Sequence, residues 1–261
     1  LSLKNFSVYK ARNPTTKDEL FKPLLDDIKS FSEKSAILNE TTISLDINKV
    51  YRLSGLSSCG KTTILKAIIK CWPYAGGKIV YPVQQDDVYF MPQKVCIPPK
   101  STILEIIAYP LKMLDCISKY NTESEYEEPF IKKVQSLLRH FNLLPNSIQE
   151  NELESVGINW DSRLSSGEKQ KLAIIRAIIK KPKLLIMDEV TIGLDDISKR
   201  AVYKVIKNEI IKKNLQNGKN SIIIYTDHNP TDNFADYVLT VDERQQLQYS
   251  DLLIGEHSHL L

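Results

Sequence analysis

A loop of small residues followed by a lysine lies in residues 53–68, which read LSGLSSCGKTTILKAI. The phosphate-binding pattern G-x-x-x-x-G-K-[ST] is matched there by Gly55, Gly60, Lys61 and Thr62. Small residues let successive backbone N–H groups converge on phosphate oxygens, and the N-terminus of the following helix adds partial positive charge. We therefore expect Lys61 to reach the β- and γ-phosphates of a nucleotide and the Thr62 hydroxyl to bind Mg²⁺.

The rest of this loop is expected to surround the nucleotide as well. Nucleotide contacts are predicted for Gly55, Leu56, Ser57, Ser58, Cys59, Gly60, Lys61, Thr62 and Thr63. Ser58 stands where many such loops have another glycine, which narrows the conformations open to the backbone. The interpretation as a phosphate loop depends on the strand pattern before it and the helix pattern after it.

A pair of carboxylates follows an apolar run in LLIMDE, residues 184–189. The four apolar residues predict a buried strand that delivers Asp188 at its C-terminal edge. In a parallel sheet this edge lies beside the phosphate loop, so Asp188 is expected in the Mg²⁺ shell. Glu189, one residue later, is placed to act as a general base toward water. Apolar runs that end in acids are common, and the phosphate loop makes this one informative.

Apolar periodicity predicts alternating strands and helices on both sides of a central helical region. The segments concerned are strands within 48–55, 180–189 and 220–228 and helices over 61–72 and 168–180. A turn is expected over 72–77. This alternation predicts a parallel sheet covered on both faces. Residues 98–163 lack a strand pattern and contain helical stretches at 101–117 and 129–141, which predicts an inserted helical subdomain.

Residues 11–36 form an unusual segment between two parts of the expected core. Apolar residues recur at helical spacing, with Asp18 as a candidate cap, at Leu20, Leu24, Ile28 and Phe31. An amphipathic helix is therefore predicted. Two interpretations stay open: a surface insertion that packs on its own sheet, or a contact with a partner domain.

The composition is that of a globular chain of 261 residues, 42% of them hydrophobic. Its 35 basic and 32 acidic residues give a net charge of +3, and their even spread does not imply nucleic acid. Apolar runs such as 184–187 fall far short of the ~20 residues that span a bilayer. The four cysteines show no metal or CxxC spacing, which favours a reducing cytosol. The start at Leu1 suggests a domain cut from a longer protein, and His257 and His259 are interpreted as part of a tail.

The segment RLSSGEKQKLAIIRAIIKKP, residues 163–182, lies between the phosphate loop and the carboxylate pair. With them it resembles the ATP-binding domain of an ABC transporter, whose LSGGQ signature is matched by Leu164, Ser165, Ser166, Gly167 and Glu168. The second serine departs from glycine, and Glu168 departs from glutamine. At a helix N-terminus, Ser165 and the amides around Gly167 make a second anion site, suited to a γ-phosphate. The resemblance implies that this phosphate belongs to the other subunit.

Other family motifs follow in the expected order. Tyr9 looks like the aromatic residue that stacks on adenine, and Gln93 looks like the Q-loop glutamine, which reaches Mg²⁺ and the attacking water. His228 looks like the switch histidine that hydrogen-bonds the γ-phosphate. The resemblance thus implies nucleotide contacts from several separate parts of the chain.

The D-loop of the family is matched least closely. The segment TIGLDD, residues 191–196, retains Asp195, whereas isoleucine and glycine replace the usual serine and alanine. The resemblance covers residues 3–245. Smaller similarities in WPYAGGKI, in IIAYP and at Trp160 resemble the half-transporters related to the peroxisomal fatty-acyl carriers and the bacterial SbmA/YddA group.

The resemblance implies an α/β fold of the P-loop NTPase kind, with a parallel sheet core, an antiparallel β portion and an inserted helical subdomain. The expected divisions are 1–97 for the N-terminal part of the core with its insertion 11–36, 98–163 for the helical subdomain, 164–248 for the rest of the core, and 249–261 for a tail. The division places the signature and Glu189 in the last part of the core.

The implied activity is hydrolysis of MgATP, with Glu189 as base and with Gln93, His228 and Lys61 as further catalytic residues. The implied metal contacts come from Thr62, Gln93 and Asp188. Two copies are expected to close on two ATPs and to drive a transmembrane domain, fused upstream or on another chain, at the cytoplasmic face of a membrane. No nucleic acid is expected.

Two alternative functions are weighed against transport. A soluble ABC-type ATPase could act on RNA or DNA, but such proteins usually carry two cassettes or a long coiled coil. A regulatory cassette could bind nucleotide without hydrolysis, but the presence of both Glu189 and His228 argues against it.

Overall fold

The computed structural model describes residues 1–10, 36–56, 59–81, 87–123, 129–227 and 234–251. The chain divides into two compact units, each built from separate segments. The first unit comprises Leu1–Phe90, Lys183–Asp188 and Asn220–Leu261. The second comprises Met91–Pro182 and Glu189–Lys219. The helix predicted within 11–36 and the histidines of the tail lie outside the described residues.

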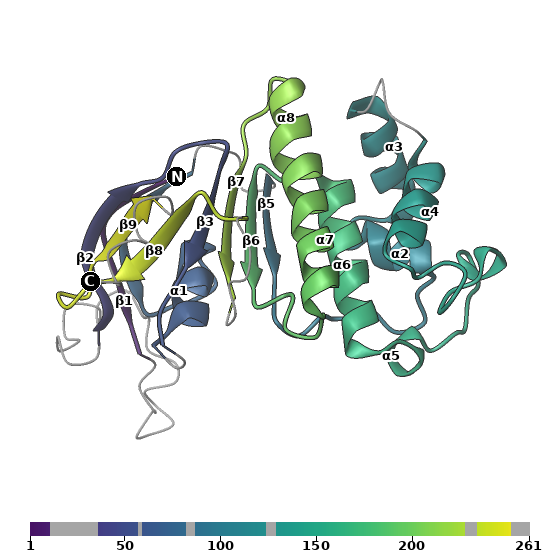
Figure 1. Cartoon of the computed structure of the whole chain (residues 1–261), viewed down its shortest axis with the longest axis horizontal. Helices are drawn as coiled ribbons and strands as arrows, with labels where there is room; N and C mark the ends of the chain where they lie inside the picture. Colours follow the sequence, from purple (N-terminus) through teal and green to yellow (C-terminus); the bar gives the residue numbers. More distant parts are fainter. Residues whose placement is uncertain (11–35, 57–58, 82–86, 124–128, 228–233, 252–261) are drawn as a thin grey trace. The chain divides into compact units, whose positions relative to one another are not determined.

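The first unit is built on a six-stranded sheet with the order β5-β6-β7-β3-β8-β9 (Figure 1). The strands are β3 (Lys49–Leu53), β5 (Val88–Met91), β6 (Leu184–Asp188), β7 (Ile222–Thr226), β8 (Tyr237–Val241) and β9 (Leu247–Asp251). The pairs β6 with β7, β7 with β3 and β3 with β8 are parallel, and β9 is antiparallel to β8. Every residue of β6 and β7 is buried, as continuous apolar runs predict for parallel strands. The predicted parallel core is thus confirmed.

A second sheet of three antiparallel strands belongs to the same unit and has the order β2-β1-β4. Its strands are β1 (Ser2–Tyr9), β2 (Ala36–Ser44) and β4 (Ala75–Val80). The turn predicted over 72–77 is too long, because β4 already begins at Ala75. Gly77 has φ 93°, and a Cβ there would lie 2.2 Å from the Asn5 carbonyl oxygen on β1. The two backbones approach so closely that this strand position requires glycine.

Helix α1 (Lys61–Ile68) follows β3 and carries the residues after the phosphate loop. Ile64, Leu65 and Ile68 are buried in a core shared with strands of both sheets. Ile64 N–H donates to the carbonyl of Gly60 at 2.9 Å, so the first helical turn begins directly at the loop. The apolar face of α1 therefore fixes where the loop ends.

The second unit is helical over most of its described length (Figure 1). Its elements are α2 (Ile103–Ala108), α3 (Met113–Glu123), α4 (Phe130–His140), the 3-10 turn η5 (Glu150–Glu152), α5 (Trp160–Arg163), α6 (Ser166–Lys180), α7 (Asp196–Ile206), the π-helical η6 (Lys207–Lys212) and α8 (Lys213–Gln216). The single helix predicted over 101–117 is in fact two, α2 and α3. Pro110 lies between them and has no N–H to continue a helix, and Tyr109 before it is extended.

Helix α6 is the central helix of this unit and contacts α2, α4 and α7. The buried Arg176 on α6 donates through Nε to the carbonyl of Ile106 at 2.8 Å, which ties α6 to α2. Within the described parts of the chain, no helix is both long enough and apolar enough to cross a lipid bilayer.

Candidate nucleotide-binding site

The phosphate loop of the first unit requires glycine at both ends. Gly55 has φ 151° and Gly60 has φ 95°, a region that side chains rarely occupy. A Cβ on Gly60 would lie 2.7 Å from the Ile37 side chain of β2, and one on Gly55 would lie 2.8 Å from Cys59 Sγ. The two glycines therefore give the loop its shape, and Ser57 and Ser58 between them lie outside the described residues.

Lys61 is held inside the loop that precedes it. Its side chain is buried, with 7% exposed, and Nζ donates to the carbonyl oxygens of Gly55 at 2.8 Å and Leu56 at 3.0 Å. These neutral partners satisfy an ammonium group, and phosphate oxygens can replace them at a gain in charge attraction. Leu56 itself is 85% exposed. Lys61 is thus positioned by the loop before any ligand arrives.

The expected metal ligands in this unit carry oxygen donors of the kind that Mg²⁺ prefers. Asp188 ends β6 and is only 3% exposed, and its Oδ1 accepts a hydrogen bond of 2.9 Å from the Thr226 hydroxyl. Thr62 and Thr63 lie half-buried in the first turn of α1. The donor chemistry of Thr62 and Asp188 therefore fits the expected ion, and His228 lies outside the described residues.

Thr226 is a residue that sequence reasoning missed. It is the last residue of β7 and is in register with Asp188 on the adjacent parallel strand. The signal was present, because the C-terminal ends of adjacent parallel strands lie together at one edge of a sheet.

Tyr9, the predicted adenine-stacking residue, ends β1 beside two other aromatic residues. Its N–H donates to the Tyr74 carbonyl at 2.9 Å, and Trp72 Nε1 donates to the Tyr9 carbonyl at 2.9 Å. The rings of Trp72 and Tyr74 meet edge to face at 5.8 Å. Sequence reasoning named Tyr9 alone, although the WPY tripeptide was a visible aromatic cluster.

Gln93 and Glu189 are brought together in the second unit, although 96 residues separate them. Gln93 Nε2 donates to Glu189 Oε2 at 2.8 Å. Glu189 has φ 51°, which for a residue other than glycine costs about 1–3 kcal/mol and is typical of functional positions. Both residues were predicted to act on the same water, and their contact is consistent with a shared role.

The signature residues form a reciprocal cap at the start of α6. The Ser165 hydroxyl accepts from the Glu168 N–H at 3.3 Å. In return, Glu168 Oε2 accepts from the Ser165 N–H at 2.8 Å and from the Ser165 hydroxyl at 2.7 Å. This capping box satisfies donors that a helix N-terminus otherwise leaves unpaired. The glutamate that replaces the family's glutamine thus has a structural role within its own chain.

Glu168 is also tied to the loop after α4. The Ser147 hydroxyl donates to Glu168 Oε1. Burial opposes the charged form, but the hydrogen bonds from Ser147 and Ser165 and the nearby Lys171 outweigh it and lower the pKa of the Glu168 carboxyl. The side chain therefore carries a full negative charge at neutral pH. Ser147 carried no signal in the sequence.

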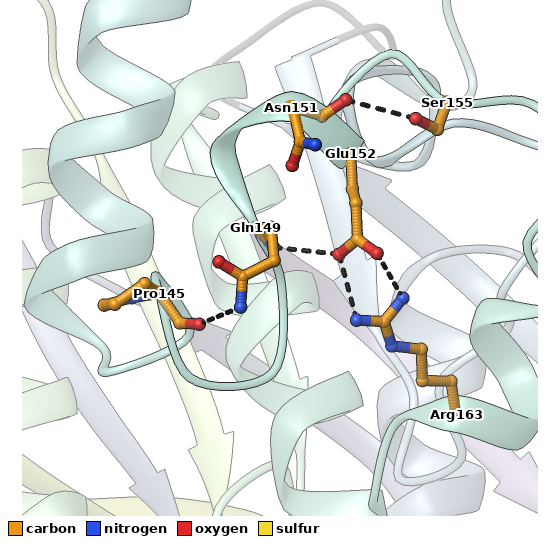
Figure 2. Close-up of polar contacts among 6 residues, drawn as sticks. All are labelled: Pro145, Gln149, Asn151, Glu152, Ser155 and Arg163. Carbon is orange, nitrogen blue, oxygen red and sulfur yellow. Dashed lines mark hydrogen bonds and ion pairs between the residues drawn. The ribbon is translucent and has the colours of Figure 1, made fainter.

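The same loop is fastened to Arg163, two residues before Ser165. Figure 2 shows the Arg163 guanidinium paired with the Glu152 carboxylate by two hydrogen bonds, of 2.8 and 2.9 Å. Glu152 also accepts from the Gln149 N–H at 2.9 Å, and Gln149 Nε2 donates to the Pro145 carbonyl at 2.6 Å. The loop 145–155 thus contacts the residue just before the signature, Arg163, and its last residue, Glu168.

The D-loop packs closely against the start of α6. A Cβ on Gly167 would lie 3.3 Å from the Gly193 carbonyl oxygen, so only a small residue fits. Asp195 caps α7 by accepting from the Ser198 hydroxyl at 2.6 Å and the Ser198 N–H at 2.9 Å, which lowers the pKa of its carboxyl. A Cβ on Gly193 would lie 3.0 Å from Gln170 Oε1, so glycine in place of the family's alanine avoids a close contact with that side chain.

A cavity of about 470 Å³ lies within the second unit, between residues 93–97 and the first turns of α6. Gln93 lines it together with Ser166, Lys169 and Gln170. Lys169 is paired with Asp161 at 2.7 Å at the same cavity. The predicted Q-loop and the signature helix therefore meet at one cavity.

Comparisons with known proteins identify the family of this chain. A family model described as ABC transporter matches residues 38–192. The chain is 34% identical over 186 residues to ABC transporter D family member 3 of Dictyostelium discoideum, covering 70% of this chain and 24% of that protein. It is 28% identical over 249 residues to the putative export ATP-binding/permease protein RT0691 of Rickettsia typhi, covering 93% and 40%.

Solved structures show the same fold. The ATP binding subunit of an ABC transporter superposes with a TM-score of 0.62 at 18% identity, over 96% of this chain and 89% of that one. A bacterial Atm1-family ABC exporter with ATP bound superposes with a TM-score of 0.62 at 18% identity, over 97% and 38%. The chain spans less than half the length of the two curated relatives named above. Because the family model covers more than half of it, the chain belongs to the ABC transporter family, as its ATP-binding domain.

Proposed function

We propose that this chain binds MgATP, hydrolyses it in a dimer of two copies, and powers transport through a transmembrane domain. The observation that carries the proposal is the phosphate loop, in which two left-handed glycines shape the backbone around Lys61. The relatives named above are transporters, which favours transport over an RNA- or DNA-directed ATPase. The name of the Rickettsia typhi relative, an export ATP-binding/permease protein, supports a location at a membrane, and the cytoplasmic face is part of the proposal.

The residues divide the work by their chemistry. Lys61 neutralises the β- and γ-phosphates, and Thr62 and Asp188 hold Mg²⁺, which when bound offsets the charge of the phosphates. Glu189 takes the proton from the attacking water, and Gln93 positions the Glu189 carboxylate through their hydrogen bond. Tyr9 is proposed to stack on adenine and His228 to bind the γ-phosphate.

The signature supplies the second half of the proposed site. Ser165 and the amides around Gly167 are proposed to bind the γ-phosphate held by the phosphate loop of the other copy, with Asp195 nearby at the interface. Each ATP then contacts both copies, so nucleotide binding and dimer closure are coupled.

The test is replacement of Glu189 by Gln, followed by light scattering at high protein concentration. Gln keeps the shape and hydrogen bonding but cannot accept the proton, so hydrolysis should nearly stop while MgATP still binds and dimers accumulate. Adding Ser165→Arg should block the dimer, whereas Ser162→Arg, at an exposed position of α5, should not. Hydrolysis at the parent rate by Glu189→Gln would contradict the assignment of the base.

A further inference from the structure

The donors that Ser165 offers to a phosphate are already used within its own chain. A serine hydroxyl has one proton, and an ionised carboxylate can only accept. The Ser165 hydroxyl therefore donates its proton to Glu168 Oε2 at 2.7 Å, and the Ser165 N–H donates to the same oxygen at 2.8 Å. Any phosphate that binds here has to replace Glu168 as the acceptor.

The acceptor that has to be replaced is itself an anion. Ser147 donates to the other oxygen of the Glu168 carboxylate, and Lys171 lies close enough to favour the charged form. A γ-phosphate at Ser165 would therefore meet a negative charge held in place by its own chain. With the glutamine that the family has at this position, the acceptor is neutral and the phosphate meets no negative charge there.

We infer that Glu168 competes with the nucleotide of the second copy for the Ser165 donors, so that the dimer closes only when the Ser165–Glu168 contact opens. The inference rests on the proposed function, because it presupposes that the signature binds the phosphate of another copy. Glu168 is then a competitor that raises the ATP concentration needed for closure, and not a ligand of the nucleotide.

The variant Glu168→Gln removes the negative charge of this side chain but keeps the capping box. The capping box accepts either Glu or Gln, since the amide oxygen still receives the Ser165 N–H. The amide nitrogen can donate toward a phosphate, and the negative charge is gone. Closure should therefore become easier while the start of α6 keeps its structure.

The experiment measures dimer formation against MgATP concentration by light scattering, in the Glu189→Gln background so that ATP persists. Adding Glu168→Gln should lower the midpoint concentration by about three- to tenfold, the difference expected when a repulsive, charge-assisted competitor becomes neutral. Glu168→Ala removes the charge together with the cap and should also lower the midpoint. Thermal unfolding monitors the cap, and only Glu168→Ala should unfold earlier.

Two matched variants control for other causes. Glu150→Gln removes a negative charge from an exposed ion pair with Arg139 in the same unit and should leave the midpoint unchanged. Ser147→Ala removes a hydrogen bond to Glu168 but keeps its charge, so it should shift the midpoint less than Glu168→Gln does.

The outcomes separate the inference from the function on which it rests. Equal midpoints with Glu168 and with Gln at this position would overturn the inference alone, as would an equal shift from Glu150→Gln. If no variant dimerises at any MgATP concentration, the proposed function and the inference both fail.

Discussion

The phosphate loop of the first unit and the signature of the second are both proposed anion sites at the start of a helix, yet they hold their key donors differently. The Lys61 amine donates hydrogen bonds to two neutral carbonyl oxygens of its own loop. The Ser165 N–H and hydroxyl donate hydrogen bonds to the charged carboxylate of Glu168. Both donors are satisfied without ligand, but only the second has an anion as its partner.

This difference predicts that the two sites respond unequally to the same phosphate. Replacing carbonyls around an ammonium by phosphate oxygens strengthens the interaction, because opposite charges come together. Replacing a carboxylate at a hydroxyl by a phosphate exchanges one anion for another and adds repulsion. Binding at the phosphate loop should therefore precede closure at the signature.

The largest expected effect comes from breaking the first site. Lys61→Ala should lower the rate of ATP hydrolysis by at least about a hundredfold, the size of effect seen when one preorganised donor to a transition-state charge is lost. Folding should survive, since the Lys61 amine donates to the carbonyl oxygens of Gly55 and Leu56 in the loop and not to a core element. Lys66→Ala, one turn later on α1, is the control. Activity near that of the parent would refute the phosphate-loop assignment.

A smaller effect is expected from Thr226→Val, which removes the hydrogen-bond donor of the proposed Mg²⁺ ligand Asp188. The variant leaves Asp188 buried without the Thr226 donor, which should destabilise the fold by about 1–3 kcal/mol. Losing a partner that orients the proposed metal-binding carboxylate should lower the affinity for Mg²⁺, and hydrolysis should need an Mg²⁺ concentration about ten- to a hundredfold higher.

A Mg²⁺ titration of activity and a urea unfolding curve measure the two consequences of Thr226→Val. Thr240→Val, the same change at an exposed position of β8, should alter neither. An unchanged Mg²⁺ requirement in Thr226→Val would mean that the Thr226 hydrogen bond does not position Asp188 for the metal.

The smallest effect is expected when the contact between Arg163 and the loop 145–155 is weakened. Arg163→Lys keeps the charge but loses the two-pronged contact with Glu152. Exposed ion pairs contribute little, so the MgATP midpoint for dimerisation should change by less than about twofold. Arg200→Lys on α7 is the control. A shift as large as that of Glu168→Gln would mean that the loop 145–155, and not the charge, controls closure.

The parts of the fold and site that follow from local pattern were predictable from the sequence. Continuous apolar runs predicted β6 and β7, and helical spacing predicted α1, α4 and α6, because these patterns repeat over neighbouring residues. Two predictions were wrong, the single helix over 101–117 and the full turn over 72–77, and both errors have local causes. Pro110 divides α2 from α3, and the close approach of β1 and β4 draws the glycines at 76–77 into a strand.

By itself the sequence determined which residues could bind phosphate and in what order they occur, because each motif is a short stretch with a fixed spacing. Only the tertiary structure decided their partners: Thr226 for Asp188, Gln93 for Glu189 and Ser147 for Glu168. These pairs join residues that are 38, 96 and 21 positions apart. No local spacing encodes such contacts, because sheet register and helix packing bring the partners together only when the whole chain has folded.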